Sequence, residues 1–167
     1  MATSDPSRGR RTGEAATVGA TRWPYRVAIC VFPEAASALK GLQQISAYGA
    51  SVSDMAVIVP TPQAADALLS GDKDCPALFL SGHAPGEPEW QHMGAPASFT
   101  VRRLADVSDW ASERTVATMR HDLSRGCVVL LVYGLRGMLQ TLMADVLLHV
   151  AASRVEVHDI PPGHLAS

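Results

Sequence analysis

Three side chains in the middle of the chain are of types that bind transition metals or react with oxidants. Cys75, His83 and His92 lie within residues 72–97. Thiolate and imidazole are common zinc ligands, and a partly exposed thiol with a lowered pKa suits redox sensing. The stretch contains no Cys-x-x-Cys or His-x-x-x-His pair, and the sequence supplies no base for Cys75. A metal or redox sensor, or a small enzyme, is therefore an alternative to a solvated connecting loop.

The sequence motifs of several enzyme classes are absent. The chain contains no G-x-x-x-x-G-K-[ST] phosphate loop, no G-x-G-x-x-G turn and no G-x-S-x-G nucleophile elbow. We therefore predict no cofactor and no catalytic residue, and we favour a non-catalytic protein.

Composition and charge narrow the class of partner. The 167 residues are 47% hydrophobic and 18% charged, which suffices for a sizeable core. The net charge is −2 and only 5% of residues are aromatic, so nucleic-acid binding, which needs basic patches and stacking rings, is not expected. Three widely spaced cysteines indicate a reducing, cytoplasmic location. No apolar stretch predicts a transmembrane segment, which leaves peripheral association with a membrane complex open.

The chain is predicted to consist of a tail and one α+β domain. Residues 1–22 carry four arginines, two acids and few large apolar residues, so we predict a disordered basic tail followed by a single domain over 23–167. Within residues 25–60, an apolar strand, a helix between Pro33 and Gly49, and a second strand form a β-α-β unit. A right-handed crossover would make its two strands parallel.

Further helices and strands are expected along the rest of the chain. Residues 61–97 are predicted to contain a helix over 61–71 with Thr61 as its cap, a brief strand over 77–80 and a loop over 82–97. The second half, residues 98–160, is predicted to contain a strand over 98–104, a helix capped by Ser108 or Asp109 that ends at Arg125-Gly126, a strand over 127–133, a helix over 135–150 and a strand over 154–160. This order predicts a ferredoxin-like α+β sandwich in which two β-α-β units share a mixed sheet.

The two β-α-β units, 25–60 and 127–160, resemble the bacterial general stress protein family, whose members pair ferredoxin-like halves. The residues that carry the resemblance are Phe32-Pro33-Glu34, Tyr48-Gly49, Ser53-Asp54, Met55-Ala-Val-Ile-Val59 and Ser124-Arg-Gly126. The resemblance covers about half of the chain. It implies a stress-response or regulatory setting and transfers no catalytic residue. Family members commonly have a glycine-rich apolar segment between the halves, and residues 61–97 depart from that pattern.

Large apolar side chains outside the predicted core indicate an interaction surface. Trp23 and Trp90 lie outside the predicted strands and helices, and Leu148 widens the apolar stripe of the helix over 135–150. Tryptophans are frequent interface anchors, although a loop tryptophan can also fold back over the core. We therefore predict an accessory or interaction protein that forms a homo-oligomer or docks as a small subunit on a larger assembly. A ligand-binding regulatory domain is a further alternative that rests on fold analogy alone.

Overall fold

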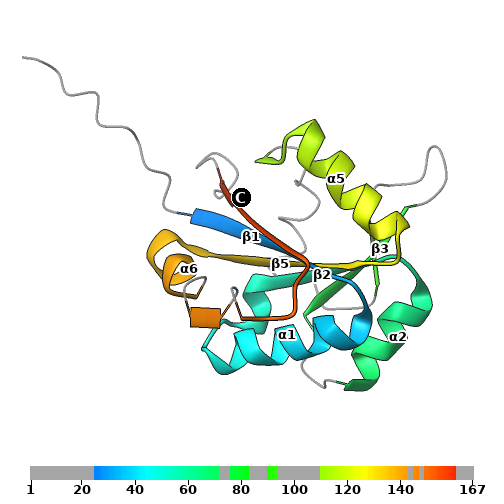
Figure 1. The fold of residues 1–167 in the computed structure, drawn as a ribbon, viewed down its shortest axis with the longest axis horizontal. Coiled ribbons are helices and arrows are strands. Elements are labelled where there is room, and N and C mark those ends of the chain that lie inside the picture. Colours follow the sequence, from blue (N-terminus) through cyan, green and yellow to red (C-terminus); the bar gives the residue numbers. More distant parts are fainter. Residues whose placement is uncertain are drawn as a thin grey trace, which may run out of the picture.

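A computed structural model gives the fold of the chain (Figure 1) and describes residues 25–71, 76–82, 90–93, 110–142, 145–146 and 149–160. The protein is α+β, as the sequence predicts, with one mixed six-stranded sheet and helices on both of its faces. The predicted tail over 1–22, the predicted strand over 98–104, and the predicted caps Ser108 and Asp109 lie outside the described residues.

The described elements alternate between strands and helices along most of the chain. In order they are β1 (Tyr25–Phe32), α1 (Ala35–Ala47), the 3-10 turn η1 (Val52–Asp54), β2 (Met55–Val59), α2 (Pro62–Gly71), β3 (Ala77–Ser81), β4 (Trp90–His92), α5 (Glu113–Ser124), β5 (Val128–Leu135), α6 (Arg136–Leu142) and β6 (Arg154–Asp159).

The first strand-helix-strand segment forms where apolar runs are separated by residues that end them. Every residue of β2 is buried, and β1 is buried from Val27 onward, which matches the continuous apolar runs expected of strands covered on both faces. Pro33 follows β1 and cannot donate a ladder hydrogen bond. Gly49 follows Tyr48, the C-cap residue of α1, and has a φ of 94°, a conformation that a Cβ atom disfavours.

The strand order places β5 inside the first unit. The order is β4-β3-β2-β5-β1-β6, and β5 pairs antiparallel with both β1 and β2. β1 and β2 therefore run in the same direction, as predicted, but are not neighbours. β6 pairs antiparallel with β1, so β1 lies between β5 and β6 in the same way. Each unit is split by a strand of the other, and both contribute to one sheet.

The core has two layers, one on each face of the sheet. α1, α2 and α6 cover one face, where Phe32, Leu42 and Leu139 belong to a single buried cluster. α5 covers the other face, where Met119 and Tyr133 belong to a second cluster. The strands between the two layers therefore bury both faces.

Three local predictions are corrected by the structure. The predicted loop over 82–97 contains β4, which pairs antiparallel with β3. The helix predicted from Ser108 or Asp109 begins at Glu113, because the Ser112 hydroxyl accepts a hydrogen bond of 3.2 Å from the Thr115 N–H and caps it. The helix predicted over 135–150 begins one residue later, with α6, because β5 continues through Leu135, opposite Tyr25. Asp145 and Val146 are helical as well, and residues 143–144 and 147–148 lie outside the described residues.

Candidate interaction surface

Two cavities lie beside the end of α1, one against α6 and the other against Asp145, Val146 and His149. The larger has a volume of about 290 Å³ and is lined by Tyr48, Gly49, Ala50, Met138, Thr141 and Leu142. The smaller has a volume of about 190 Å³ and is lined by Gln44, Ala47, Tyr48, Asp145, Val146 and His149. Tyr48 lines both cavities, and we call the residues that line the two of them the Tyr48 surface.

The Tyr48 surface has an apolar floor and a polar rim. Ala50, Leu142 and Val146 are buried and belong to the core cluster beneath α1. The rim side chains are exposed and polar: Gln44, Thr141, Asp145 and His149. An apolar centre within a polar rim is the usual anatomy of a protein–protein interface.

Two large hydrophobic side chains stand exposed on this surface. Tyr48 is 60% exposed and Met138 is 40% exposed. Among the described residues, Leu69 at 52% is the one other large hydrophobic that is exposed, and it lies on α2, at the opposite end of α1 from Tyr48 (Figure 1). A tyrosine buries about 150–250 Å² when fully covered, so covering the exposed part of Tyr48 yields up to about 3 kcal/mol.

Local backbone geometry explains why Tyr48 is exposed. Its N–H bonds to the carbonyl of Gln44 at 3.2 Å, and it is the capping residue after α1. The helical spacing of apolar residues in the sequence predicts that Tyr48 and Met138 continue the buried faces of their helices, and this prediction is wrong. The buried positions near the end of α1 stop at Ile45, and α6 buries Leu139 and Leu142 instead of Met138.

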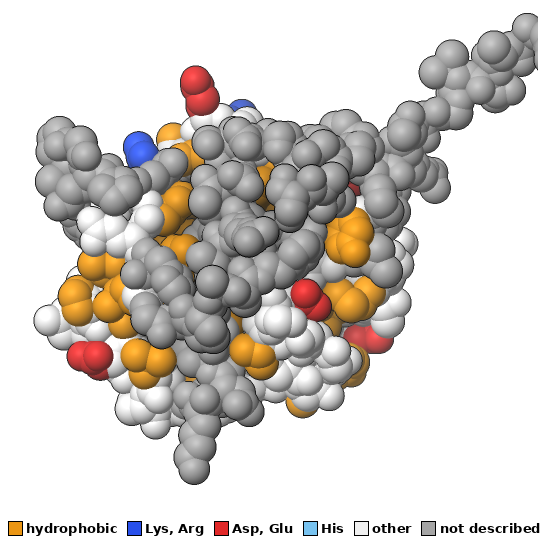
Figure 2. Space-filling model, turned by 180° about the vertical axis from the view of Figure 1, so that it is seen from behind, with side chains coloured by type: hydrophobic (Ala, Val, Ile, Leu, Met, Phe, Trp, Pro, Cys, Tyr) orange, Lys and Arg blue, Asp and Glu red, His pale blue; other side chains and the backbone are white. Residues whose placement is uncertain are grey.

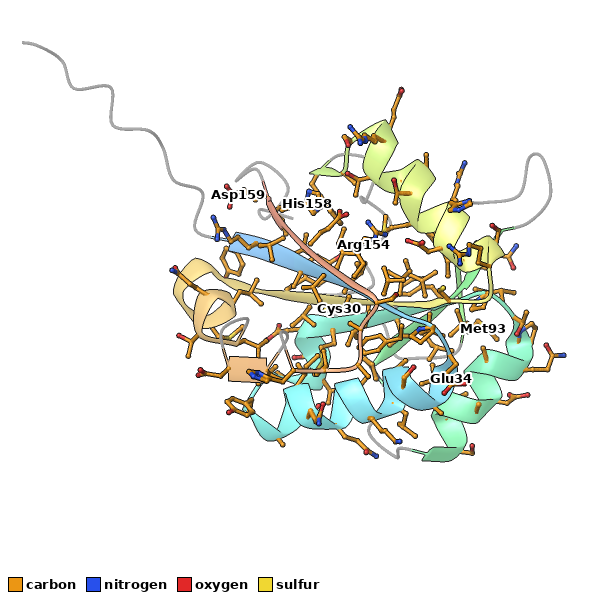
Figure 3. The ribbon with its side chains drawn as sticks, viewed as in Figure 1. Cys30, Glu34, Met93, Arg154, His158 and Asp159 are labelled. Atoms are coloured by element: carbon orange, nitrogen blue, oxygen red, sulfur yellow. The ribbon has the colours of Figure 1, made fainter. Side chains whose placement is uncertain are left out.

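A second polar group, the β6 cluster, lies between β6 and α5. It consists of Arg154, Glu156 and His158 on alternate positions of β6, with Asp122 of α5. Figure 3 labels Arg154 and His158 on β6. The Arg154 guanidinium forms ion pairs with both Asp122 and Glu156. His158 Nε2 lies 3.3 Å from Glu156 Oε2. The cluster therefore ties α5 to the last strand of the sheet.

The charges of the β6 cluster compensate one another. Burial opposes the charge of Arg154, but hydrogen bonds and attraction to Glu156 and Asp122 outweigh it and raise the pKa of the guanidinium. Burial likewise opposes ionisation of Glu156, but the hydrogen bond and charge of Arg154, with a contribution from His158, lower the pKa of its carboxyl. Glu156 is thus an ionised acceptor at neutral pH, which does not suit a general acid.

The ring of Trp110 lies beside the His158 end of this cluster. The Trp110 ring centroid lies 6.2 Å from that of His158 and 6.5 Å from that of Tyr133, the latter in a perpendicular arrangement. Edge-to-face pairs of this kind are favourable. The indole N–H of Trp110 is buried without a hydrogen-bond partner among the described residues. Trp110 therefore serves as a packing residue of the second core layer.

Most of the candidate site residues named from the sequence lie outside the part of the chain that the structure describes. Trp23, Leu148, Cys75 and His83 lie outside the described residues, and for His92 the backbone is described within β4 but the side chain is not. The predicted metal or redox set and most of the predicted interface set therefore stay predictions.

Trp90 lies in β4, so the prediction that it stands outside regular structure is wrong. Its ring is half-buried and packs against the second core cluster. Its indole N–H is buried and has no hydrogen-bond partner within the part of the chain that is described. Trp90 therefore resembles a tryptophan folded over the core more than an exposed anchor.

The described cysteines are not arranged for chemistry. Cys30 and Cys127 are free thiols, and burial of Cys30 in β1 raises its pKa to about 12. The described ranges contain no group of three or more His, Cys, Asp or Glu side chains that could hold a metal ion.

No helix within the described residues has both the length and the apolarity to cross a bilayer.

The face of the molecule opposite to the view of Figure 1 carries several separate hydrophobic groups and few lysine or arginine side chains among its described residues (Figure 2). A basic patch that could collect phosphates is not seen among the described side chains of that face.

Comparisons of the chain with protein-family models, with curated proteins and with solved structures find no significant match.

Proposed function

We propose that this chain is a non-catalytic interaction protein that binds another protein chain, either a second copy or a larger assembly, through the Tyr48 surface. One observation carries the proposal. Tyr48 and Met138, two of the three large hydrophobics exposed in the described part of the chain, line the same cavity. Exposed hydrophobic side chains that lie together within a polar rim are a common feature of protein-interaction sites.

The chemistry around the cavities favours contact over catalysis. The ionisable side chains that line them are Tyr48, Asp145 and His149, and all three are exposed to solvent. Catalytic acids and bases are usually buried or placed beside another charge. Among the described residues, close ion pairs lie elsewhere: Arg154 with Asp122 and Glu156 in the β6 cluster, and Arg26 with Asp159.

The proposal extends to the finer fold and to the setting. The order β2-β5-β1-β6, with α1 and α6 on one face, supports a ferredoxin-like arrangement of these four strands, which β3 and β4 extend. The resemblance of residues 25–60 and 127–160 to the general stress protein family supports a stress-related or regulatory role in a bacterial cytoplasm.

The test uses the full chain and two surface variants. The double variant Tyr48→Ser/Met138→Ser removes both exposed side chains from the cavities, and Leu69→Ser removes a side chain of similar exposure from α2. Folding of each variant is checked by thermal unfolding, because Met138 is 40% exposed and the rest of its side chain is covered. Self-association is measured by sedimentation velocity of the pure protein, and stoichiometric partners by quantitative co-purification of the tagged chain from its own cells.

We expect at least a tenfold loss of association for the double variant and none for Leu69→Ser, since about 1.4 kcal/mol of lost contact weakens binding tenfold. A chain that is monomeric and has no stoichiometric protein partner contradicts the proposal. Equal association of the double variant and of the wild type contradicts it as well. Recovery of a small apolar ligand in the cavities by native mass spectrometry, with no protein bound, favours the ligand-binding alternative and overturns the proposal.

A further inference from the structure

Met138 is the most exposed methionine among the described residues. It is 40% exposed, whereas Met55 and Met119 are completely buried. Met93 is half-buried and packs against the core cluster beneath α1. Oxidants convert methionine to its sulfoxide, and they react faster with side chains that solvent reaches. The structure therefore ranks the described methionines by reactivity, with Met138 first.

The packing around Met138 keeps its side chain at the surface. Leu139 and Leu142 of the same helix are buried in the core cluster beneath α1, so α6 cannot turn to bury Met138 in their place. The terminal methyl group lies against Gly134 of β5, because a Cβ atom added to Gly134 would be 2.1 Å from Met138 Cε. The side chain therefore has a defined place beside β5, where it lines the larger cavity.

Oxidation of Met138 would change the character of that cavity. Its lining includes the apolar side chains of Ala50 and Leu142 together with Tyr48. The thioether of methionine is apolar, whereas a sulfoxide is polar. Covering the added oxygen with an apolar partner group is unfavourable unless it receives a hydrogen bond. A partner that fits the reduced surface should therefore bind the oxidised surface more weakly.

We infer that Met138 is a modification site, at which a hydroperoxide forms methionine sulfoxide and thereby releases the partner bound at the Tyr48 surface. The inference rests on the proposed function and adds a means of regulating it. A lone pair of the Met138 sulfur attacks the terminal peroxide oxygen, the O–O bond breaks and an S–O bond forms. The sulfur is oxidised by two electrons and the hydroperoxide is reduced by two. The other peroxide oxygen leaves and takes up the proton of the transferred oxygen, which gives an alcohol, or water from hydrogen peroxide.

Binding and oxidation oppose each other at this residue. A partner that covers Met138 excludes the oxidant, so the free chain is the form that reacts. Saturating the Tyr48 surface with its partner should therefore slow sulfoxide formation at Met138 and leave the rate at Met93 unchanged.

The site is tested by mapping oxidation in the full chain. The pure protein, dilute enough to be monomeric, is treated with hydrogen peroxide and digested, and the sulfoxide fraction of each methionine peptide is followed by mass spectrometry. We expect Met138 to react at least about tenfold faster than Met55 and Met119, which the oxidant reaches only when the chain opens. Equal rates at the three residues, or a faster reaction at Met55 or Met119, overturn the assignment.

The consequence for binding is tested with two leucine variants, each compared with itself before and after peroxide. Leucine is apolar, has a similar volume and cannot form a sulfoxide. Met138→Leu should keep its own association after treatment, whereas Met93→Leu should lose association as the wild type does. Association of the wild type should weaken at least about fivefold and should recover when methionine sulfoxide reductases remove the oxygen. Thermal unfolding of each oxidised protein shows whether it is still folded.

The outcomes separate this inference from the proposed function. Association through Tyr48 that persists after complete oxidation of Met138 overturns the inference but supports the proposed function. Equal loss of association in treated Met138→Leu, or unfolding of the oxidised wild type, overturns the inference as well, because the loss then has another cause. A chain without a partner before treatment contradicts the proposed function and with it the release, while the order of methionine oxidation still decides whether Met138 is the reactive site.

Discussion

Replacing Gly41 with alanine tests the packing between α1 and β1. A Cβ atom at Gly41 would lie 2.5 Å from Cζ and 2.6 Å from Cε1 of Phe32, whose ring is completely buried. Contacts this short essentially never occur for a Cβ atom, so either the ring or the helix must move. The neighbours of Phe32 in the buried cluster leave little space for that movement.

The expected sign follows from two opposing contributions. An alanine inside a helix is more favourable than glycine by about 1 kcal/mol, whereas overpacking a core costs about 1–3 kcal/mol. The direct clash with an enclosed ring places this site toward the upper end of that cost. We therefore expect Gly41→Ala to lower the free energy of unfolding by about 1–2 kcal/mol.

The assay is urea and thermal unfolding of the full chain followed by circular dichroism, where each kcal/mol shifts the melting temperature by about 2–4 °C in a chain of this size. Gly137→Ala in α6 is the matched control, because nothing lies within 4 Å of its added Cβ, and it should leave stability unchanged or raise it. Adding Phe32→Leu to Gly41→Ala should cost less than the sum of the two single changes. A gain in stability for Gly41→Ala equal to that of Gly137→Ala would refute the packing described here.

Three other changes have expected outcomes. Arg154→Met should lower the free energy of unfolding by about 1–2 kcal/mol, measured in urea, because it leaves the partly buried Asp122 and Glu156 without their cation; equal stability would show that the ion pairs contribute nothing. Because the folded pKa of Glu156 lies below its ordinary value of 4.5, its contribution is present above pH 4.5 and is lost as pH falls further, so Glu156→Gln should lose less stability over that acid range than the wild type. Burial raises the pKa of Cys30 to about 12, so mass spectrometry should find it alkylated at neutral pH only as fast as the protein unfolds, and rapid labelling in the native state would contradict its burial.

Local signals in the sequence predict the elements of the first β-α-β unit well. The apolar run over Val27–Phe32 and the residues Pro33 and Gly49 indicate where strand, helix and turn change, and the structure has β1 and α1 there. The hydroxyl of Thr61 caps α2 as predicted, accepting the Ala64 N–H at 3.2 Å. These features depend on neighbouring residues alone, so their signal is present in the sequence itself.

Features that depend on distant residues are not predicted. The place of β5 between β1 and β2 is set by pairing partners about a hundred residues apart, such as Cys30 and Leu130, and no local pattern encodes it. β4 was not predicted because its three residues lie in a Gly- and Pro-rich stretch and form a strand only by pairing with β3.

The candidate surface was missed for a geometric reason. Periodicity assigns Tyr48 to the buried stripe of its helix, but α1 ends at Ala47 and its last buried position is Ile45, so the side chain of Tyr48 lies beyond the part of the helix that packs on the sheet. Periodicity likewise assigns Met138 to the buried stripe of the helix predicted over 135–150, but α6 buries Leu139 and Leu142 and leaves Met138 exposed. A useful signal was the Tyr48-Gly49 pair, which indicates that the helix ends at an aromatic residue.

The slot that β5 occupies constrains how the chain is made. During translation, β1 and β2 are synthesised well before β5. Until β5 has left the ribosome, β1 and β2 cannot be joined in the native sheet, because each pairs with β5 and not with the other. The apolar strands β1 and β2 therefore stay without their native partner until the residues from α2 to α5 have been synthesised. Pairing between residues distant in sequence slows folding and makes nascent chains prone to aggregation. We expect fragments that stop before residue 128 to require a chaperone or to precipitate.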